Sequence, residues 1–338
     1  MNLTCAGDEM KRLKMTYRLF TFLAAAAMLT ACEKDELPVE PFPRGAAEIG
    51  SLFMGAFYSD QVWYSLRSNS EVTRNKITDW DIALEGAPNG WKIYLNGARM
   101  MTGWLSPHNH INTATDTAGF GSAKRAEIAA EFFDAPALPD WHDHPGAVYL
   151  LDLGFSELGV AMGLVWMQVV SADENQYEIC TRLFAESEVR THEIPKNPGH
   201  HLVHFSILQG STVSAAPPDN AWDLVFTKYT FQFVDPPLAY LVTGAILNPH
   251  NTRAMVISDK AFEAITAADT LQYPKINQPD IIGYDWKTYS FDLGQFTVNS
   301  ERTYLIQVQS GFLYKIRFVD FYNASGAAGA PMFEKVLV

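Results

Sequence analysis

Residues Tyr304–Tyr322, which read YLIQVQSGFLYKIRFVDFY, contain the pattern that decides the fold. Apolar residues recur at every second position on both sides of Ser310-Gly311. Tyr304, Ile306 and Val308 share one face of the first segment. Period-two alternation around a glycine turn predicts a β-hairpin with one buried face.

A second copy of this pattern lies upstream at Leu164–Phe184, LVWMQVVSADENQYEICTRLF. Short matches link the surroundings of the two copies in the same order, at an offset that drifts from 142 to 137 residues: Trp80–Leu84 with Trp222–Phe226, Leu105–Asn109 with Leu247–Asn251, Tyr149–Gly154 with Tyr289–Gly294, Gln168–Ser171 with Gln307–Ser310, and Tyr177–Ile179 with Tyr314–Ile316. A repeated series of this kind predicts two tandem lobes of one architecture, at residues 51–195 and 196–338. Pro195–Gly199 is the predicted linker.

Each lobe is predicted to be mainly β, an antiparallel sandwich-like sheet with one short helix. The predicted helices are Ser122–Phe133 and Ser258–Ala268, each opened by a serine able to cap the first turn. The predicted strands are Leu52–Tyr58, Val62–Leu66, Trp80–Leu84, Trp91–Leu95, Val148–Leu153, Gly163–Val170 and Tyr177–Phe184, then Leu202–Leu208, Trp222–Phe233, Tyr240–Leu247, Arg253–Ile257, Thr288–Asp292, Tyr304–Gln309 and Phe312–Tyr322.

The N-terminus has the features of a targeting segment. A basic region that includes Lys11 and Arg18 precedes the apolar run Leu19–Thr30, which is too short to span a bilayer. Leu29-Thr30-Ala31-Cys32 resembles a bacterial lipobox, which implies removal of residues 1–31 and lipidation of Cys32. An ordinary secretory peptide with a chance cysteine is the alternative.

Residues 32–50 are predicted to be a tether. Glu33–Glu36 resembles the export signal of Bacteroidetes surface lipoproteins, and the prolines that follow stiffen the spacer. The predicted location is therefore the outer membrane, with a lipid anchor and exposure at the cell surface.

Charge and cysteine content exclude several classes of protein. Removing residues 1–31 takes away four basic and two acidic residues, which leaves 21 positive and 36 negative charges, net −15. This balance argues against nucleic acid and against an anionic membrane surface as partners. Only Cys180 is left beside the lipidated cysteine, so no disulfide framework can form within one chain.

The second lobe resembles the HmuY family of Bacteroidetes haem-binding lipoproteins. The resemblance rests on Trp222–Phe226, on the segment from Asp280 to Tyr322, and on the tail Phe321–Glu334. The first lobe is similar to a diverged copy, whereas the family normally has one lobe. The resemblance implies an all-β fold and capture of haem, or of haem from host carriers, for delivery to a TonB-dependent outer-membrane receptor.

Haem needs an axial His or Met and an apolar slot. His108 and His250 both occur in Leu-x-Pro-His-Asn, and His110, Met100 and Met101 lie near the first of them. A site could use one histidine from each copy, or His108 or His110 with a methionine. The alternative is that Pro-His-Asn is only a turn.

Other histidine and Trp-Asp pairs favour structural roles. His142 and His144 could chelate a transition metal if extended, but no third ligand is evident. His200, His201 and His204 are interpreted as a solvated strand edge. The repeated pairs Trp80-Asp81 and Trp222-Asp223 are expected to serve the fold, with the carboxylate bound to turn amides.

No catalytic motif stands out, since the sequence has no phosphate loop, nucleophile elbow or His-Glu-x-x-His. Together with the resemblance to the HmuY family, which implies haem binding, this absence predicts a non-enzymatic haem-binding surface lipoprotein. The alternative is a lipoprotein without haem ligation that binds a glycan through Trp91, Trp104 and Trp141, or binds a protein partner.

Overall fold

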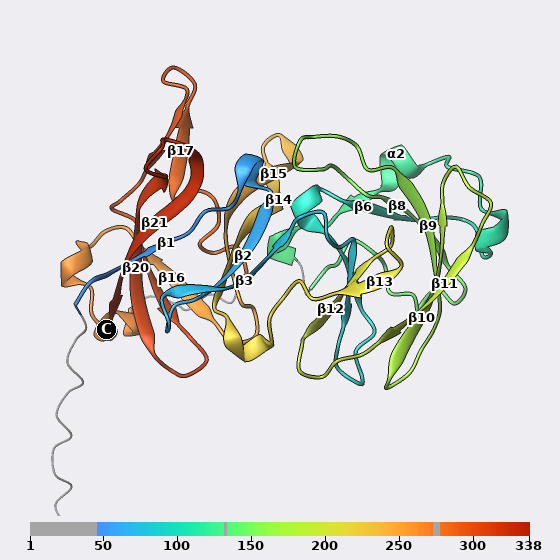
Figure 1. Cartoon of the computed structure of the whole chain (residues 1–338), viewed down its shortest axis with the longest axis horizontal. Helices are drawn as coiled ribbons and strands as arrows, with labels where there is room; N and C mark the ends of the chain where they lie inside the picture. Colours follow the sequence, from blue (N-terminus) through green and yellow to red (C-terminus); the bar gives the residue numbers. More distant parts are fainter. Residues whose placement is uncertain (1–45, 132–133, 273–277) are drawn as a thin grey trace, which may run out of the picture. The chain divides into compact units, whose positions relative to one another are not determined.

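The computed structural model describes residues 46–131, 134–272 and 278–338, and the predicted signal peptide and Cys32 lie outside them. The described chain is mainly β, as predicted, with four antiparallel sheets and one separate hairpin (Figure 1). No helix in these residues is long and apolar enough to cross a membrane.

The Tyr304–Tyr322 stretch forms the predicted hairpin from β19 (Thr303–Gln307) and β20 (Leu313–Tyr322). Gly311 adopts φ +82° in the connecting turn, a value that glycine accepts without a side-chain clash. The hairpin lies inside a five-stranded sheet of order β1-β21-β20-β19-β16, with β1 at Glu48–Ser51, β21 at Ala328–Leu337 and β16 at Arg253–Ile257. Residues 48–50 of the predicted tether are therefore part of a strand.

The upstream copy occupies the same place in a second large sheet. β9 (Leu164–Ala172) and β10 (Gln176–Leu183) pair as a hairpin in a six-stranded sheet of order β11-β10-β9-β8-β6-β7. The other strands are β11 at Arg190–Pro195, β8 at Val148–Asp152, β6 at Thr102–Leu105 and β7 at Arg125–Ala126.

The two four-stranded sheets each combine strands from both halves of the sequence. In one, the order is β13-β12-β4-β5, and in the other it is β15-β14-β2-β3. The strands are β12 Leu202–Ser206, β13 Ser211–Val213, β4 Ile82–Glu85 and β5 Ile93–Leu95, then β2 Asp60–Ser65, β3 Ser70–Lys76, β14 Leu224–Val234 and β15 Pro237–Leu247.

The hairpin that opens each predicted lobe thus pairs with the other lobe. β2 pairs with β14, which follows Trp222-Asp223, and β12 pairs with β4, which follows Trp80-Asp81. We call this pairing of each opening hairpin with the other lobe the strand exchange. It also mixes the two halves in the hydrophobic core, since Tyr64 of β2 packs on Phe226 of β14 at 6.0 Å between ring centroids. If the chain were divided into lobes at Pro195–Gly199, each of the two four-stranded sheets would contain strands from both lobes.

The Trp-Asp pairs fasten the exchanged hairpins, as their repetition predicts. The Asp81 carboxylate accepts a hydrogen bond from the Ile207 amide at 2.7 Å, at the end of β12. The Asp223 carboxylate accepts one from the Leu66 amide at 2.7 Å, at the end of β2. Arg99, fully buried, also forms an ion pair with Asp81.

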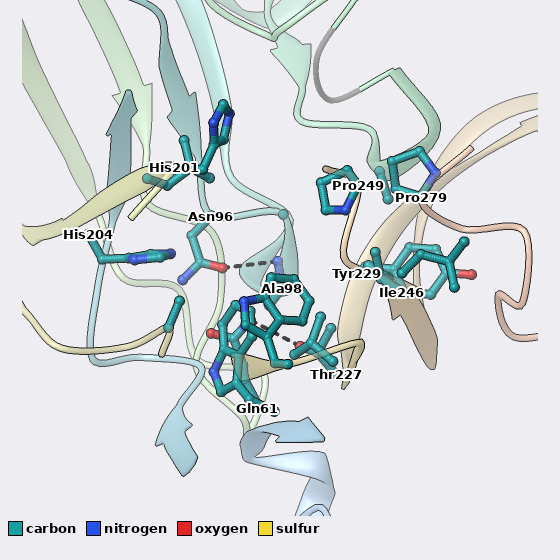
Figure 2. A pocket seen from close by; sticks show the side chains of 18 of the residues that line it. Gln61, Asn96, Ala98, His201, His204, Thr227, Tyr229, Ile246, Pro249 and Pro279 are labelled. Atoms are coloured by element: carbon teal, nitrogen blue, oxygen red, sulfur yellow. Dashed lines mark hydrogen bonds between the residues drawn. The ribbon is translucent and has the colours of Figure 1, made fainter. Parts of the chain in front are cut away.

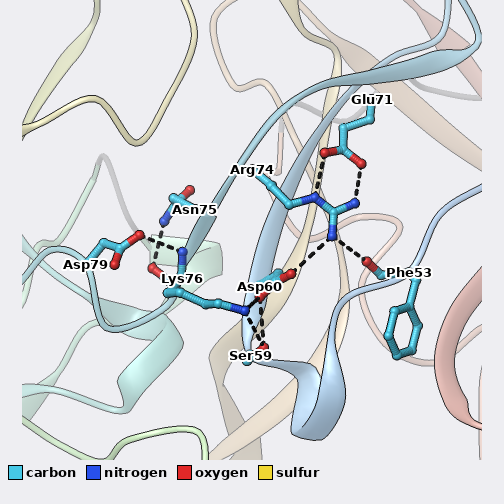
Figure 3. A network of polar contacts seen from close by, with 8 residues as sticks. All are labelled: Phe53, Ser59, Asp60, Glu71, Arg74, Asn75, Lys76 and Asp79. Atoms are coloured by element: carbon cyan, nitrogen blue, oxygen red, sulfur yellow. Dashed lines mark hydrogen bonds and ion pairs between the residues drawn. The ribbon is translucent and has the colours of Figure 1, made fainter.

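Ion pairs connect β2 and β3 along one side of their hairpin (Figure 3). Asp60, on β2, is buried and lies between Lys76 and Arg74, the latter at 3.1 Å, and Arg74 also forks onto Glu71. Burial raises the pKa of Asp60, but the hydrogen bonds from Lys76 and Ser59 outweigh it and hold that pKa below its usual value.

The predicted helices are reduced to single turns. The last two residues of the predicted helix Ser122–Phe133 lie outside the described residues, and over the rest the chain forms α2 (Phe120–Ala123), strand β7 and the 3₁₀ turn η5 (Ala129–Glu131). In place of Ser258–Ala268 it forms η7 (Phe262–Ala264) and η8 (Ala267–Leu271). The buried Lys315 ammonium binds the carbonyls of Phe262 and Ile265, and a continuous helix would need the first of these for the Thr266 amide. The remaining elements are η2 Ala56–Tyr58, η3 Gly97–Arg99, η4 Ile111–Thr113, η6 Asp219–Ala221, β17 Lys287–Ser290 and β18 Gln295–Val298.

Replacing the carboxylate that joins β4 to β12 tests the exchange. We expect Asp81→Ala to lower the free energy of unfolding by ~3–5 kcal/mol, because it leaves the Arg99 guanidinium buried without its counter-ion. Urea unfolding followed by tryptophan fluorescence measures this loss. The exposed Glu174→Ala is the matched control, and a loss below ~1 kcal/mol for Asp81→Ala would contradict the role given to this carboxylate.

Candidate functional site

A cavity of about 140 Å³ lies between the two four-stranded sheets. Figure 2 shows His204 and Asn96 on one side of it, with Pro249 and Ile246 on the other. We call it the histidine cavity, lined among others by Trp63, Trp80, His201, His204, Trp222 and His250. It exists because the exchange brings β2 and β14 opposite β4 and β12.

Aromatic rings and one buried amide line the inner part of the cavity. The Trp63 and Trp222 ring centroids lie 4.5 Å apart, edge to face. The Gln61 amide oxygen accepts hydrogen bonds from the Trp80 indole at 2.7 Å and from the Asn75 amide at 2.9 Å. The Gln61 nitrogen donates to the Thr227 hydroxyl at 3.2 Å, which links β2 to β14 through side chains. Since the Trp63 indole donates to Asn75 at 3.0 Å, this network holds the indoles of Trp63 and Trp80 in place.

His204 lies inside this aromatic cluster. Its ring packs edge-on against Trp80 at 4.6 Å, and the residue is 5% exposed. Burial, with a smaller contribution from His200, lowers the pKa of His204 to about 3. Its imidazole is therefore neutral at physiological pH.

His201 and His250 form a pair at the rim. Their ring centroids are 3.6 Å apart, with an angle of 43° between the planes. The His201 amide donates to the Asp219 carboxylate at 2.9 Å, and the His250 amide donates to the Asn248 side chain at 3.2 Å. These bonds hold both backbones on the loop around η6.

Both imidazoles of the pair are neutral at pH 7. Burial, followed by the His250 ring, lowers the pKa of His201 to about 4. Partial burial also lowers the pKa of His250, although Asp219 acts in the opposite direction. Neutral imidazole is the form that ligates iron and other transition metals.

The geometry limits what the pair can ligate. An imidazole nitrogen bonds a metal at about 2.0–2.1 Å, so rings on opposite sides of one iron would have centroids about 6 Å apart. At 3.6 Å the two rings are too close for that arrangement without moving. In residues 46–131, 134–272 and 278–338, no group of three or more His, Cys, Asp or Glu side chains is placed to hold a metal ion.

Comparison with known proteins identifies the family. The model of the HmuY protein family matches residues 57–334, which is most of the sequence. The chain belongs to the HmuY family. No curated protein matches it.

Solved structures add only distant similarities to this HmuY-family chain. Apo PinO from Porphyromonas gingivitis is 8% identical over 87% of this chain and 98% of its own, with a TM-score of 0.34. A putative HmuY-like heme binding protein from Bacteroides vulgatus is 13% identical over 51% and 90%, with a TM-score of 0.17. A putative lipoprotein from Bacteroides fragilis is 14% identical over 51% and 88%, with a TM-score of 0.17. Scores this low do not establish a shared fold, and membership of the HmuY family rests on the match of the family model to residues 57–334.

The predicted haem ligands of this HmuY-family chain lie in different places. His250 lines the histidine cavity, whereas Met100 lines a separate cleft. The His108 ring packs on Trp166 at 5.7 Å and accepts a hydrogen bond from the Asp116 amide. His110 is exposed and Met101 is buried in a core. The structure therefore does not bring His108 and His250 together in the cavity.

The pairing of His108 with His250 by sequence is wrong as a structural equivalence. The Asn96 side chain donates to the carbonyl of Trp80, and the Asn248 side chain donates to the carbonyl of Trp222. Asn96 and Asn248 are thus equivalent positions of the two copies, so Ala98, and not His108, is the residue that corresponds to His250. Asn248 follows Asn96 by 152 residues, ten more than the 142 between the tryptophans, because β14 and β15 are longer than β4 and β5.

The interpretation of His200, His201 and His204 as a solvated strand edge is also wrong. β12 is an inner strand between β13 and β4, so His204 is buried and His201 reaches the cavity. The sequence feature that indicates a site here is the close spacing of these three histidines after the turn at Pro198-Gly199.

Two of the three tryptophans expected on the surface are covered. Trp104 is buried. Trp141 is stacked under His142 at 3.8 Å, and the His142 ring is hydrogen-bonded to Asp140. Trp91 is 41% exposed, and its indole nitrogen donates to Asp140.

The buried neutral His204 predicts a pH dependence of stability. Its folded-state pKa of about 3 lies below the unfolded value of about 6.5, so between these values only the unfolded chain binds the proton. Its contribution to stability is therefore present above pH 6.5 and is lost as pH falls, by about 1.4 kcal/mol per pH unit. We expect urea unfolding at pH 4–6 to show this steeper slope for the native chain than for His204→Asn. Equal slopes would contradict the assignment.

Proposed function

We propose that this chain is a surface-anchored, non-enzymatic lipoprotein that binds haem and captures it for uptake. The observation that carries the proposal is membership of the HmuY family over residues 57–334. The expected acceptor of the haem is a TonB-dependent receptor in the outer membrane, as the resemblance to haem-binding members of this family implies.

The rim of the histidine cavity is the proposed haem site. Neutral His201 and His250 can supply an axial nitrogen to iron, and the indoles beneath them supply apolar surface. The cavity itself measures about 140 Å³, which is enough for a molecule the size of benzene. A porphyrin is too large to enter it and must therefore lie across the rim.

A neighbouring hollow enlarges the space at this rim. It measures about 340 Å³ and shares His200, Leu202 and His204 with the histidine cavity. A planar ligand across the rim would thus meet imidazoles from both the β12 side and the β15 side. Binding of one iron by both histidines needs the two rings, whose centroids are 3.6 Å apart, to separate.

A haem titration tests this site. We expect the purified mature chain to shift and sharpen the Soret band of haemin, and His201→Ala or His250→Ala to weaken binding at least tenfold, because each removes a ligand candidate. The exposed His144→Ala is the control.

The same titration separates the alternatives. A spectrum of haemin left unchanged by the native chain at micromolar concentration would overturn haem binding. A loss caused by His108→Ala, with His201→Ala inert, would move the site to the first-copy histidine that the sequence pattern favours.

The lipid anchor is tested through its cysteine. Cys32 is proposed to carry the lipid, because it follows the lipobox Leu29-Thr30-Ala31. We expect radiolabelled palmitate to label the chain in a bacterial host and Cys32→Ser to abolish the label. Cys180→Ser is the control, since Cys180 lies on β10 beside Thr191. Labelling that survives Cys32→Ser would contradict the anchor.

A further inference from the structure

A second hollow, open and larger, lies on the other side of Lys228 from the histidine cavity. It measures about 580 Å³, within the roughly 300–1,000 Å³ range of small-molecule sites. We call it the Met100 cleft, and its walls include Phe57, Tyr58, Met100, Phe155, Lys228 and Tyr240. These residues come from η2, from the end of η3, from the turn after β8 and from the β14–β15 hairpin.

The walls of the Met100 cleft are apolar yet open to solvent. Phe57 is 64% exposed, Phe155 40% and Tyr240 56%. Leu158 and Val160, from the same turn as Phe155, are also exposed. Exposed aromatic and aliphatic side chains gathered around a hollow are typical of a surface that binds an apolar partner.

Lys228 adds one positive charge to this apolar site. It is half-buried on β14, and its ammonium contacts the Glu157 carbonyl oxygen at 3.4 Å. Burial lowers the pKa of Lys228, and Glu157 partly opposes that shift. Within the described residues no carboxylate forms an ion pair with Lys228. A partly desolvated ammonium of this kind attracts a carboxylate from a ligand.

The backbone of the cleft is also unusual. Phe57, Tyr58 and Met100 have φ of 56°, 56° and 59°, and they are three of the four non-glycine residues with positive φ in the described chain. Bulky side chains adopt this region at a cost in free energy, and such residues cluster at ligand sites. Here the conformation directs two aromatic rings and a thioether to one hollow.

We propose that the Met100 cleft binds an apolar carboxylate, with the carboxylate on Lys228 Nζ and the apolar body between Phe57, Phe155 and Tyr240. The ligand class includes a fatty acid and the propionate edge of a porphyrin. Lys228 borders both hollows, whereas Phe57, Phe155 and Tyr240 line the cleft only, so variants of these three residues test the cleft separately from the histidine cavity.

Displacement of a dansyl-labelled undecanoate from the full-length mature chain tests the proposal. We expect laurate to displace the probe and dodecanol, which has the same chain without the charge, to compete at least tenfold more weakly. Lys228→Met should weaken laurate binding at least tenfold, with the exposed Lys124→Met as the matched control. Phe57→Ala and Tyr240→Ala, which remove exposed side chains, should weaken it without loss of fold by circular dichroism.

The outcomes are distinct. Equal competition by laurate and dodecanol, or full affinity in Lys228→Met and Phe57→Ala, would overturn the proposal. Displacement by haemin as well as laurate identifies the porphyrin propionate as a source of the same chemistry, and displacement by laurate alone identifies a fatty acid. A haem titration of Phe57→Ala keeps the two sites apart, since haem bound at the histidine cavity should still shift the Soret band while laurate binding is weakened.

Discussion

Two buried carboxylates join strands from opposite halves of the chain. Asp81 binds the amide that ends β12, and Asp223 binds the amide that ends β2. Both are buried, so their charges require these partners. Asp81 directly precedes the β4 region and Asp223 the β14 region, which pair with β12 and β2 of the other half. Each hydrogen bond therefore fixes the register between the two paired strands. Neither core is complete until the hairpin of the other half has docked.

The exchange also explains where the hollows lie. The β2–β14 pair lies opposite the β4–β12 pair, and aromatic residues from both pairs line the histidine cavity between them. β14 carries Thr227 toward the histidine cavity, while Lys228 borders both this cavity and the Met100 cleft. The two candidate sites are therefore consequences of one packing arrangement.

The sequence allowed the fold class to be predicted, because alternation and glycine turns are local signals. The hairpin at Tyr304–Tyr322 and the role of the Trp-Asp pairs are confirmed on that basis. Strand exchange could not be predicted, since it depends on pairing between distant segments that either lobe could satisfy. The burial of His204 follows from that exchange, so it was missed too. The second predicted helix is interrupted where Lys315, far along the chain, binds the Phe262 carbonyl that a helix would use.

The repeat shows why similarity of sequence is a weak guide to the ligand site. Asn96 and Asn248 do the same structural work, binding the carbonyl of the tryptophan in their own copy. The residues that follow have diverged. In the first copy Ala98 and Arg99 occupy these positions, and the guanidinium pairs with Asp81 inside the protein. In the second copy the position of Ala98 is taken by His250, whose ring lies against that of His201 at the cavity rim. Since alanine carries no imidazole, the first copy has no counterpart of His250 and cannot form the same histidine pair.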